Sequence, residues 1–303
     1  MIKFILIFIF LIFANNSYSS NVLNITFLGT GSPRPDINKL GPSVLIKNKN
    51  EEIILDIGRG TTLRLNQIGN DFSKIKDIYI SHFHFDHIVG LPDFWLTSNL
   101  WQKKEDTNVY GPKGIKSFCN SIRNAFKEDI KYRYNKNIKS NINCFNFSKI
   151  NNDSLKKIKV LPFENSHGHI DNSYGFKIIF KDKKIVYSGD TTYSDNLINN
   201  YIGSDILIHE IIATTSKIYQ NNKKLRKVFS THTSINQIIK ILNKAKPKLT
   251  ILNHALLFGV SEEFVLSEIS KKYKGKVIFS KDLMSIDLGE ELNIFNIDNI
   301  KNE

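Results

Sequence analysis

Three histidines and an aspartate lie within six positions, directly after a predicted buried strand. The segment reads Ser81-His82-Phe83-His84-Phe85-Asp86-His87. The C-terminal end of a buried strand is where α/β proteins usually build ligand sites. His82 and His84 stand two apart on extended backbone and can point to one side, whereas Asp86 and His87 come after the chain turns. This loop therefore predicts ligands for two neighbouring metal positions.

The remaining polar chemistry is consistent with a metal held by imidazole and carboxylate groups. All eight histidines fall between positions 82 and 254, at 82, 84, 87, 167, 169, 209, 232 and 254. The only two cysteines, Cys119 and Cys144, have no C-x-x-C spacing that would indicate a thiolate zinc site or a redox pair. The sequence leaves open whether these two cysteines form a disulfide.

Composition and patterning indicate one layered globular domain. The 303 residues are 41% hydrophobic and 23% charged, which lies in the ordinary globular range. Short strand patterns alternate with helical ones in two successive halves of the chain, before and after the Asn/Lys-rich stretch 132–157. Two sheets packed face to face with helices outside would produce this order. We therefore expect a single α/β domain over residues 21–303.

The pattern His82-x-His84-x-Asp86-His87 resembles the metal motif of the metallo-β-lactamase superfamily of binuclear metallohydrolases. Further matches spread over most of the chain: His169 before Gly175-Phe176, Asp190 in Ser-Gly-Asp-Thr, His254 after Leu-Asn, and Asp56, which matches the aspartate that braces the histidine loop. The resemblance implies an αββα sandwich, an α/β (α+β layered) fold of two mixed sheets flanked by helices. It also implies these metal ligands: His82, His84 and His169 at one metal, Asp86, His87 and His254 at the other, and Asp190 bridging.

Within the superfamily, three segments resemble the ribonuclease Z and arylsulfatase-like branch. They are Gly29–Pro33, the pair His209-Glu210, and Ser230–Ser234. This resemblance implies catalytic roles for Asp86, Glu210 and His232: Asp86 takes part in proton transfer, and Glu210 orients the His232 imidazole, which protonates the leaving group. With the ligand positions filled, His167 and His209 are expected to be supporting or structural residues.

The implied chemistry is ester hydrolysis by a metal-bridging hydroxide, with two Zn²⁺ per chain. Mn and Fe remain alternatives, because they accept the same ligand types. We expect phosphodiester or sulfate-ester substrates, with cyclic-nucleotide phosphodiesterase and lactonase activities as variants. A catalytically idle binding protein is a separate alternative. A ribonuclease Z-like tRNA 3′-processing endonuclease is also kept. It is weakened because only 21 residues separate His169 from Asp190, too few for the tRNA-gripping arm that bacterial ribonuclease Z inserts there.

The N-terminus predicts export. Residues 1–20 combine one lysine, an apolar run of eleven residues and a small polar tail, which is the layout of a cleavable signal peptide. We therefore expect a periplasmic or secreted enzyme with no membrane span after cleavage, acting on a small anionic ester. Nucleic acid is kept as a less favoured partner, because segment 103–159 carries 12 Lys and 2 Arg against 5 acidic residues. A homodimer is compatible with the sequence.

Overall fold

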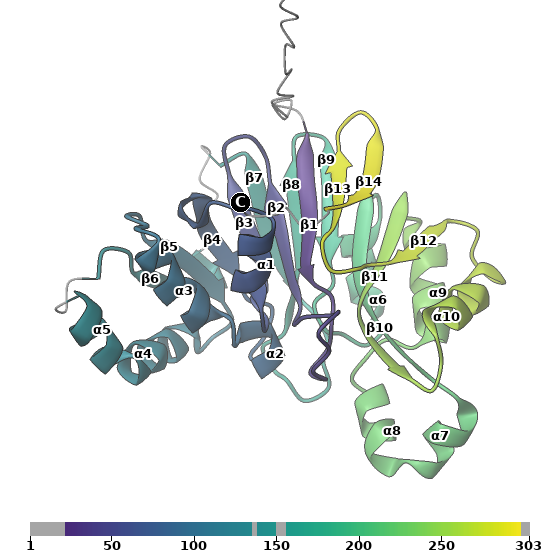
Figure 1. The fold of residues 1–303 in the computed structure, drawn as a ribbon. Coiled ribbons are helices and arrows are strands. Elements are labelled where there is room, and N and C mark those ends of the chain that lie inside the picture. The colour runs from purple at the N-terminus through teal and green to yellow at the C-terminus, as the bar shows by residue number, and fades with distance from the viewer. Residues whose placement is uncertain (1–21, 135–137, 150–155, 298–303) are drawn as a thin grey trace, which may run out of the picture.

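Two β-sheets pack face to face in the computed structural model, which describes residues 22–134, 138–149 and 156–297 (Figure 1). The eight-stranded sheet has the order β14-β13-β1-β2-β3-β4-β5-β6. Its strands are β1 (Leu23–Gly29), β2 (Ser43–Lys47), β3 (Glu52–Leu55), β4 (Ile75–Tyr79), β5 (Thr107–Gly111), β6 (Ile142–Asn146), β13 (Met284–Leu288) and β14 (Leu292–Asn296). The six-stranded sheet has the order β12-β11-β10-β9-β8-β7. Its strands are β7 (Ile158–Glu164), β8 (Tyr174–Phe180), β9 (Lys183–Tyr187), β10 (Ile206–Thr214), β11 (Leu249–Phe258) and β12 (Lys276–Phe279).

Each sheet has an antiparallel part and a parallel part. In the first sheet, pairing is antiparallel from β14 to β3 and parallel from β3 to β6. In the second, it is antiparallel from β7 to β9 and parallel from β9 to β12. The loops that leave parallel strands meet at one edge of a sheet. This arrangement brings the predicted histidine loop after β4 and the loops after β9 and β10 to positions where they can face one another.

Apolar side chains fill the space between the sheets and the space under the helices. The interior cluster includes Phe27 of β1, Phe176 of β8 and Ile208 of β10, all fully buried. Alternation of such residues along each strand is what directs one face of each sheet inward. The sandwich interior is therefore a packed core, and the polar site lies at its edge.

Helices cover the outer faces of both sheets, as Figure 1 shows. On the eight-stranded sheet these are α1 (Thr61–Gln67), α3 (Leu91–Leu100) and α4 (Ile115–Ala125), and on the six-stranded sheet α6 (Asp195–Tyr201), α9 (Ile235–Ala245) and α10 (Glu262–Ser270). Helix α9 begins with a capping box formed by Ser234 and Gln237. The remaining α-helices are α2 (Phe85–Ile88), α5 (Lys127–Tyr134), α7 (Ser216–Asn221) and α8 (Lys223–Phe229).

The predicted αββα fold is confirmed, and the structure adds what the sequence left open. Cys119 of α4 and Cys144 of β6 form a disulfide. Residues 1–20, the predicted signal peptide, lie outside the described residues. Across the described ranges, no helix has the length and apolar character that crossing a membrane requires.

Candidate metal centre

The histidine loop leaves the end of β4 and continues into α2. His82 is fully buried, and Asp86 and His87 occupy the first turn of α2, where they are buried as well. The Nε2 of His82 lies 2.9 Å from the Nδ1 of His84. Asp86 and His87 follow on the first turn of α2, and the ring centroid of His87 lies 4.2 Å from that of His82. The loop thus supplies ligands to two groups, as its spacing predicts.

The side chain of Asp56 holds this loop in place through hydrogen bonds. Its carboxylate accepts hydrogen bonds from the backbone N–H of Ser81 (2.7 Å), the Oγ–H of Ser81 (2.8 Å), the Nδ1–H of His87 (2.8 Å) and the phenol of Tyr187 (2.8 Å). Asp56 follows β3, whereas Tyr187 ends β9, so the brace joins the two sheets. Asp56 itself has a positive φ of 53°, a conformation that its surroundings must stabilise.

The partners of three imidazoles select the tautomer that a metal needs. Besides His87, the Nδ1 of His82 faces the hydroxyl of Ser81 at 3.0 Å, and that hydroxyl donates to Asp56. The Nδ1 of His167 donates to the carbonyl of Thr231 at 2.8 Å. In the neutral form of each ring, Nδ1 carries the proton and Nε2 keeps the lone pair that a metal binds. Those three lone pairs are directed into the same small volume.

One carboxylate oxygen lies between the two groups of ligands. The Oδ2 of Asp190, just after β9, is 3.5 Å from His87 Nε2 and 3.6 Å from His254 Nε2. The same oxygen is 3.9 Å from the Nε2 atoms of His82 and His167. A single oxygen at similar distances from imidazoles of both groups occupies the position of a bridging ligand.

His254 reaches this site through a β-bulge. Along the parallel pair of β10 and β11, Glu210 pairs with Asn253 and Ile211 with Ala255, so His254 has no cross-strand partner. Its φ is +48°, in the left-handed region that non-glycine residues rarely adopt. The extra residue re-aims the imidazole, whose Nε2 lies 3.2 Å from the Oδ2 of Asp86.

His167, and not His169, completes the first group. His82, His84, His167 and Asp190 each offer a ligand atom within 4.8 Å of the others, and Asp86, His87 and His254 form the second such group. His169 is exposed. The chain turns tightly there, with His167 bridged to Ile170 and Gly168 at φ +63°. The two histidines of the turn consequently face opposite ways, and the sequence prediction selected the outer one.

The chemistry of these residues fits divalent metal ions. Asp56, Asp86 and Asp190 are three buried carboxylates in one place, and no lysine or arginine side chain of the described residues is paired with them. His87 Nε2 and Asp86 Oδ1 are buried without a hydrogen-bond partner. Burial alone would lower the pKa of His87, but the carboxylates of Asp190 and Asp56 raise it well above its usual value. Such a site is built to hold added positive charge.

The three histidines of the first group, unlike His87 of the second, are suited to binding as neutral ligands. Burial holds the pKa values of His82, His84 and His167 below the ordinary value, and neighbouring imidazoles lower them further. A metal binds the neutral imidazole, so proton competition is weak at neutral pH.

Glu210 and His232 form a pair beside the ligand groups. Glu210 Oε1, at the middle of β10, accepts the backbone N–H groups of Thr233 (2.8 Å) and Thr191 (3.2 Å) and lies 3.4 Å from His232 Nδ1. The His232 ring centroid is 4.9 Å from that of His167. Burial alone would lower the pKa of His232, but the Glu210 carboxylate raises it to about 9. His232 is therefore an imidazolium at neutral pH.

The structure brings together six of the seven predicted ligands: His82, His84, Asp86, His87, Asp190 and His254. His209 stands in neither group. It is buried against Tyr201, and its Nδ1 donates to the carbonyl of Glu210. Sequence reasoning missed His167 as a member and Tyr187 as a partner of Asp56. For His167 the signal was the doublet His-Gly-His, which offers two candidates and does not choose between them.

This architecture is that of a metallo-β-lactamase superfamily hydrolase, a metal-dependent enzyme that acts on ester bonds. The solved structure of the metallo-β-lactamase fold protein YhfI from Bacillus subtilis matches with a TM-score of 0.69 and 17% identity, over 88% of this chain and all of that one. Zn²⁺-bound PqqB from Methylobacterium extorquens matches with a TM-score of 0.64 and 10% identity, over 88% and 100%.

Sequence relatives then define the branch and the family. Ribonuclease Z of Pyrococcus abyssi is 30% identical over 266 residues, which cover 74% of this chain and 83% of that protein. The model of the family described as Anti-Pycsar protein Apyc1 matches residues 23–255. The chain belongs to this Apyc1 family, within the ribonuclease Z branch of the superfamily.

Proposed function

We propose that this chain is an exported phosphodiester hydrolase that uses two divalent ions, with zinc as the first candidate. One observation carries the proposal: the Oδ2 of Asp190 lies 3.5 to 3.9 Å from the Nε2 atoms of four histidines that belong to two ligand groups. Metal 1 would be held by His82, His84 and His167, and metal 2 by Asp86, His87 and His254, with Asp190 shared. Ions bound there would activate water and neutralise charge on the ester oxygens.

The chain's own residues would manage the protons. The Nδ1 side of His232 faces Glu210, which leaves Nε2–H free to donate to the departing oxygen as the P–O bond breaks. Glu210 is held by two backbone N–H groups and keeps the imidazole oriented and charged. Asp86, whose Oδ1 has no partner, can accept the proton of the attacking water. The ester oxygen leaves as an alcohol and the water oxygen remains on phosphorus.

A substrate panel tests the reaction. Zinc-loaded protein should hydrolyse bis(p-nitrophenyl) phosphate faster than p-nitrophenyl phosphate, p-nitrophenyl sulfate or a chromogenic lactone. Elemental analysis should find about two ions per chain. Asp190→Ala should lose both metal and activity, because one side chain serves both positions. Turnover confined to the sulfate or the lactone would contradict the proposal of a phosphodiester substrate. A single ion in the fully loaded protein would contradict the proposal that two ions bind.

Two features support export. Residues 1–20 have the layout of a signal peptide, and the disulfide between Cys119 and Cys144 is of a kind that persists in oxidising compartments. N-terminal sequencing of the protein from an extracellular or periplasmic fraction should begin near Ser20. An intact Met1 on protein from the cytoplasm would contradict this part of the proposal.

A nucleic-acid substrate is the second candidate, because a curated relative in this branch carries the name ribonuclease Z. The interval between His167 and Asp190 offers no arm of the ribonuclease Z type. It contains a β-hairpin, in which β8 and β9 pair antiparallel along five positions. Any nucleic acid would need a different surface.

A further inference from the structure

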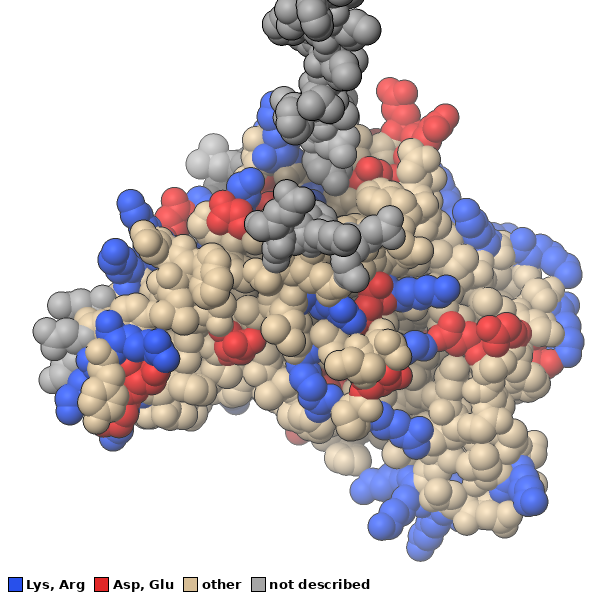
Figure 2. Space-filling model, in the orientation of Figure 1, with Lys and Arg blue, Asp and Glu red and all other residues tan. Residues whose placement is uncertain are grey.

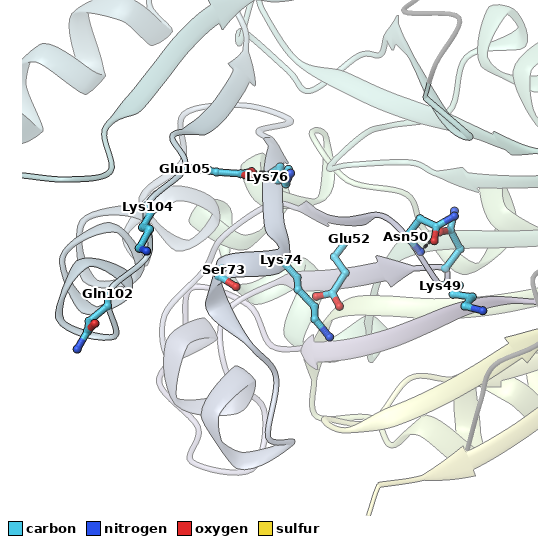
Figure 3. A pocket seen from close by; sticks show the side chains of 10 residues that line it. Lys49, Asn50, Glu52, Ser73, Lys74, Lys76, Gln102, Lys104 and Glu105 are labelled. Carbon is cyan, nitrogen blue, oxygen red and sulfur yellow. Dashed lines mark hydrogen bonds and ion pairs between the residues drawn. The ribbon is translucent and has the colours of Figure 1, made fainter. Parts of the chain in front are cut away.

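A pocket lies at the edge of the eight-stranded sheet where β4 begins. Its volume is about 530 Å³, within the range of ordinary ligand sites. Its walls come from three neighbouring parts of the sheet: the turn between β2 and β3, the start of β4 with the residues before it, and the segment that leads into β5 (Figure 3). The metal-binding loop leaves the other end of β4, a strand of five residues and roughly 16 Å. The pocket is therefore separate from the candidate metal centre.

Lysine side chains give this pocket an excess of positive charge. Two carboxylates and four lysines line it: Glu52, Glu105, Lys49, Lys74, Lys76 and Lys104. Glu105 pairs with Lys76 at 2.5 Å, and Glu52 accepts a hydrogen bond from the side-chain amide of Asn70 at 2.9 Å. Among the ion pairs of the described residues, none includes Lys49, Lys74 or Lys104. Figure 2 shows basic and acidic side chains mixed at this end of the molecule, so these three ammonium groups, and not a uniformly basic surface, distinguish the pocket.

Asn48 adds a hydrogen-bond donor that the protein itself does not satisfy. Its Oδ1 accepts the backbone N–H groups of Asn50 at 2.7 Å and Glu51 at 3.0 Å, which closes the turn between β2 and β3. Two donors on that atom identify it as the amide oxygen, so the other atom is the NH₂ group. This Nδ2 is buried and has no hydrogen-bond partner. Because a buried donor without an acceptor is destabilising, a ligand oxygen seated against Asn48 would supply what the turn lacks.

A buried lysine holds two walls of the pocket together. Lys103 precedes the lining residue Lys104, and its ammonium group donates to the backbone carbonyls of Phe72 and Ile75. These bonds tie the segment that leads into β5 to the start of β4. The backbone of both walls is thus fixed before a ligand binds, which lowers the entropic cost of binding.

Separate donors around an open pocket suit a phosphate group. A phosphate carries about −1.5 to −2 charge at neutral pH and has three strong acceptor oxygens, so ammonium and amide groups from different walls can bind it together. A carboxylate is better matched by the fork of an arginine, and no arginine is among the described residues that line this pocket. A metal cation would be repelled by the lysines. The volume exceeds what a bare oxyanion fills, which favours a phosphate carried by a larger molecule.

We propose that this pocket binds a phosphate group, carried by a soluble compound or by the headgroup of an anionic lipid. Lys49, Lys74 and Lys104 would neutralise its charge, and Asn48 would donate a hydrogen bond to one of its oxygens. The site does not depend on the proposed function, because it lies at the other end of β4. A ligand held there would leave the metal centre accessible to substrate.

The first test locates the bound phosphate. Zinc-loaded protein is titrated with inorganic phosphate while backbone amide signals are followed by NMR. The amides of residues 48–50 and 73–76 should shift together and saturate, along a curve separate from that of the metal loop, residues 82–87. Asn48→Asp keeps the oxygen that closes the turn and removes the donor, so the affinity reported by the first set of amides should fall at least about tenfold. The curve of the metal loop should stay unchanged.

Two variants with the same loss of charge separate the pocket from net charge. Changing Lys49, Lys74 and Lys104 to Gln should weaken phosphate binding at the pocket about fivefold or more. In the control, three exposed lysines of α7 and α8, where Figure 2 shows blue atoms gathered, are changed to Gln; they are Lys217, Lys223 and Lys224. The control should retain the affinity of the unchanged protein.

Cosedimentation with vesicles identifies the source of the phosphate. Vesicles of phosphatidylglycerol and phosphatidylcholine are compared with vesicles of phosphatidylcholine alone. Sedimentation with the anionic vesicles that inorganic phosphate reverses and Asn48→Asp abolishes would assign the site to a lipid headgroup. Saturable phosphate binding at the pocket without sedimentation would assign it to a soluble compound.

Three results would overturn the proposal. The first is an absence of phosphate-dependent shifts at residues 48–50 and 73–76. The second is an affinity that Asn48→Asp leaves unchanged. The third is an equal loss in the two lysine variants, which would mean that net charge alone attracts the anion. None of these readouts requires turnover, so a failure of the proposed function would leave this test intact.

Discussion

Asp56→Asn is the sharpest test of how the metal loop is supported. The side chain is fully buried and accepts four hydrogen bonds, one on Oδ1 from the Ser81 N–H and three on Oδ2 from Ser81 Oγ, His87 and Tyr187. The amide of Asn keeps one acceptor oxygen. In the least costly orientation that oxygen takes the place of Oδ2 and keeps three of the hydrogen bonds. The new NH₂ group then faces the Ser81 N–H, and that donor has no acceptor. All other orientations strand more donors.

The cost follows from this count. One donor left without an acceptor costs about 1–3 kcal/mol. The other three hydrogen bonds change from a charged to a neutral acceptor, and each loses about 1 kcal/mol. Burying a neutral amide in place of a carboxylate offsets part of this. We therefore expect a net loss of about 3 kcal/mol in the free energy of unfolding of metal-free protein. Loss of the partner that orients His87 should lower metal affinity about 10- to 100-fold.

Urea unfolding of the chelator-treated protein and a competitive zinc titration give the two quantities. Asp77→Asn is the matched control. Asp77 is a buried carboxylate like Asp56, but it lies in β4, where it pairs with Lys156 and Asn108 away from the metal loop. It should lower stability and leave zinc affinity unchanged. The reasoning is refuted if Asp56→Asn weakens zinc binding no more than the control does.

Three further predictions follow from the site and the disulfide. His167→Ala should remove about one equivalent of zinc, whereas His169→Ala should retain both, which elemental analysis decides; the reverse result would restore the ligand set predicted from sequence. The Cys119–Cys144 bond closes a loop with a sequence separation of 25, so reduction should lower the free energy of unfolding by up to about 3.5 kcal/mol, and an unchanged urea midpoint would contradict this. Because Glu210 raises the pKa of His232 to about 9, turnover of alkyl phosphodiesters should fall as pH rises through about 9. The variant His232→Ala should lower this turnover about 10²- to 10⁴-fold, with a smaller effect on nitrophenyl esters and no loss of metal. Equal losses on both kinds of ester would assign His232 to substrate positioning.

The spacing of residues in the sequence predicted the metal loop, because its four polar residues lie within six consecutive positions. His82, His84, Asp86 and His87 take their places from one strand end and one helical turn, both visible as hydrophobic pattern and spacing. The αββα arrangement was also predictable, since strands and helices alternate twice. The return of β13 to pair with β1 was not, because that contact joins residues more than 250 positions apart.

Long-range features of the site escaped prediction for the same reason. The choice between His167 and His169 depends on which side of a tight turn faces Thr231, a residue 64 positions away from His167. The bulge at His254 depends on the register between β10 and β11. Helices α7 and α8 left no hydrophobic period to detect, because they pack against each other and Leu225 is the only buried residue of these two helices.

The metal centre and the packing of the two sheets depend on each other. The segment after β4 of the eight-stranded sheet supplies His82, His84, Asp86 and His87. The six-stranded sheet supplies His167 and Asp190 from its loops and His254 from β11. Without added cations, Asp56, Asp86 and Asp190 are three buried carboxylates at this junction, and the described ion-pair partners of Asp86 and Asp190 are imidazoles. Bound ions would therefore act as a cross-link at the edge of the sandwich, and the bond from Tyr187 to Asp56 would be its protein counterpart. Occupancy of the site should consequently control how firmly the β9 and β10 ends are held, and with them Glu210, His232 and the helices α7 and α8 between them.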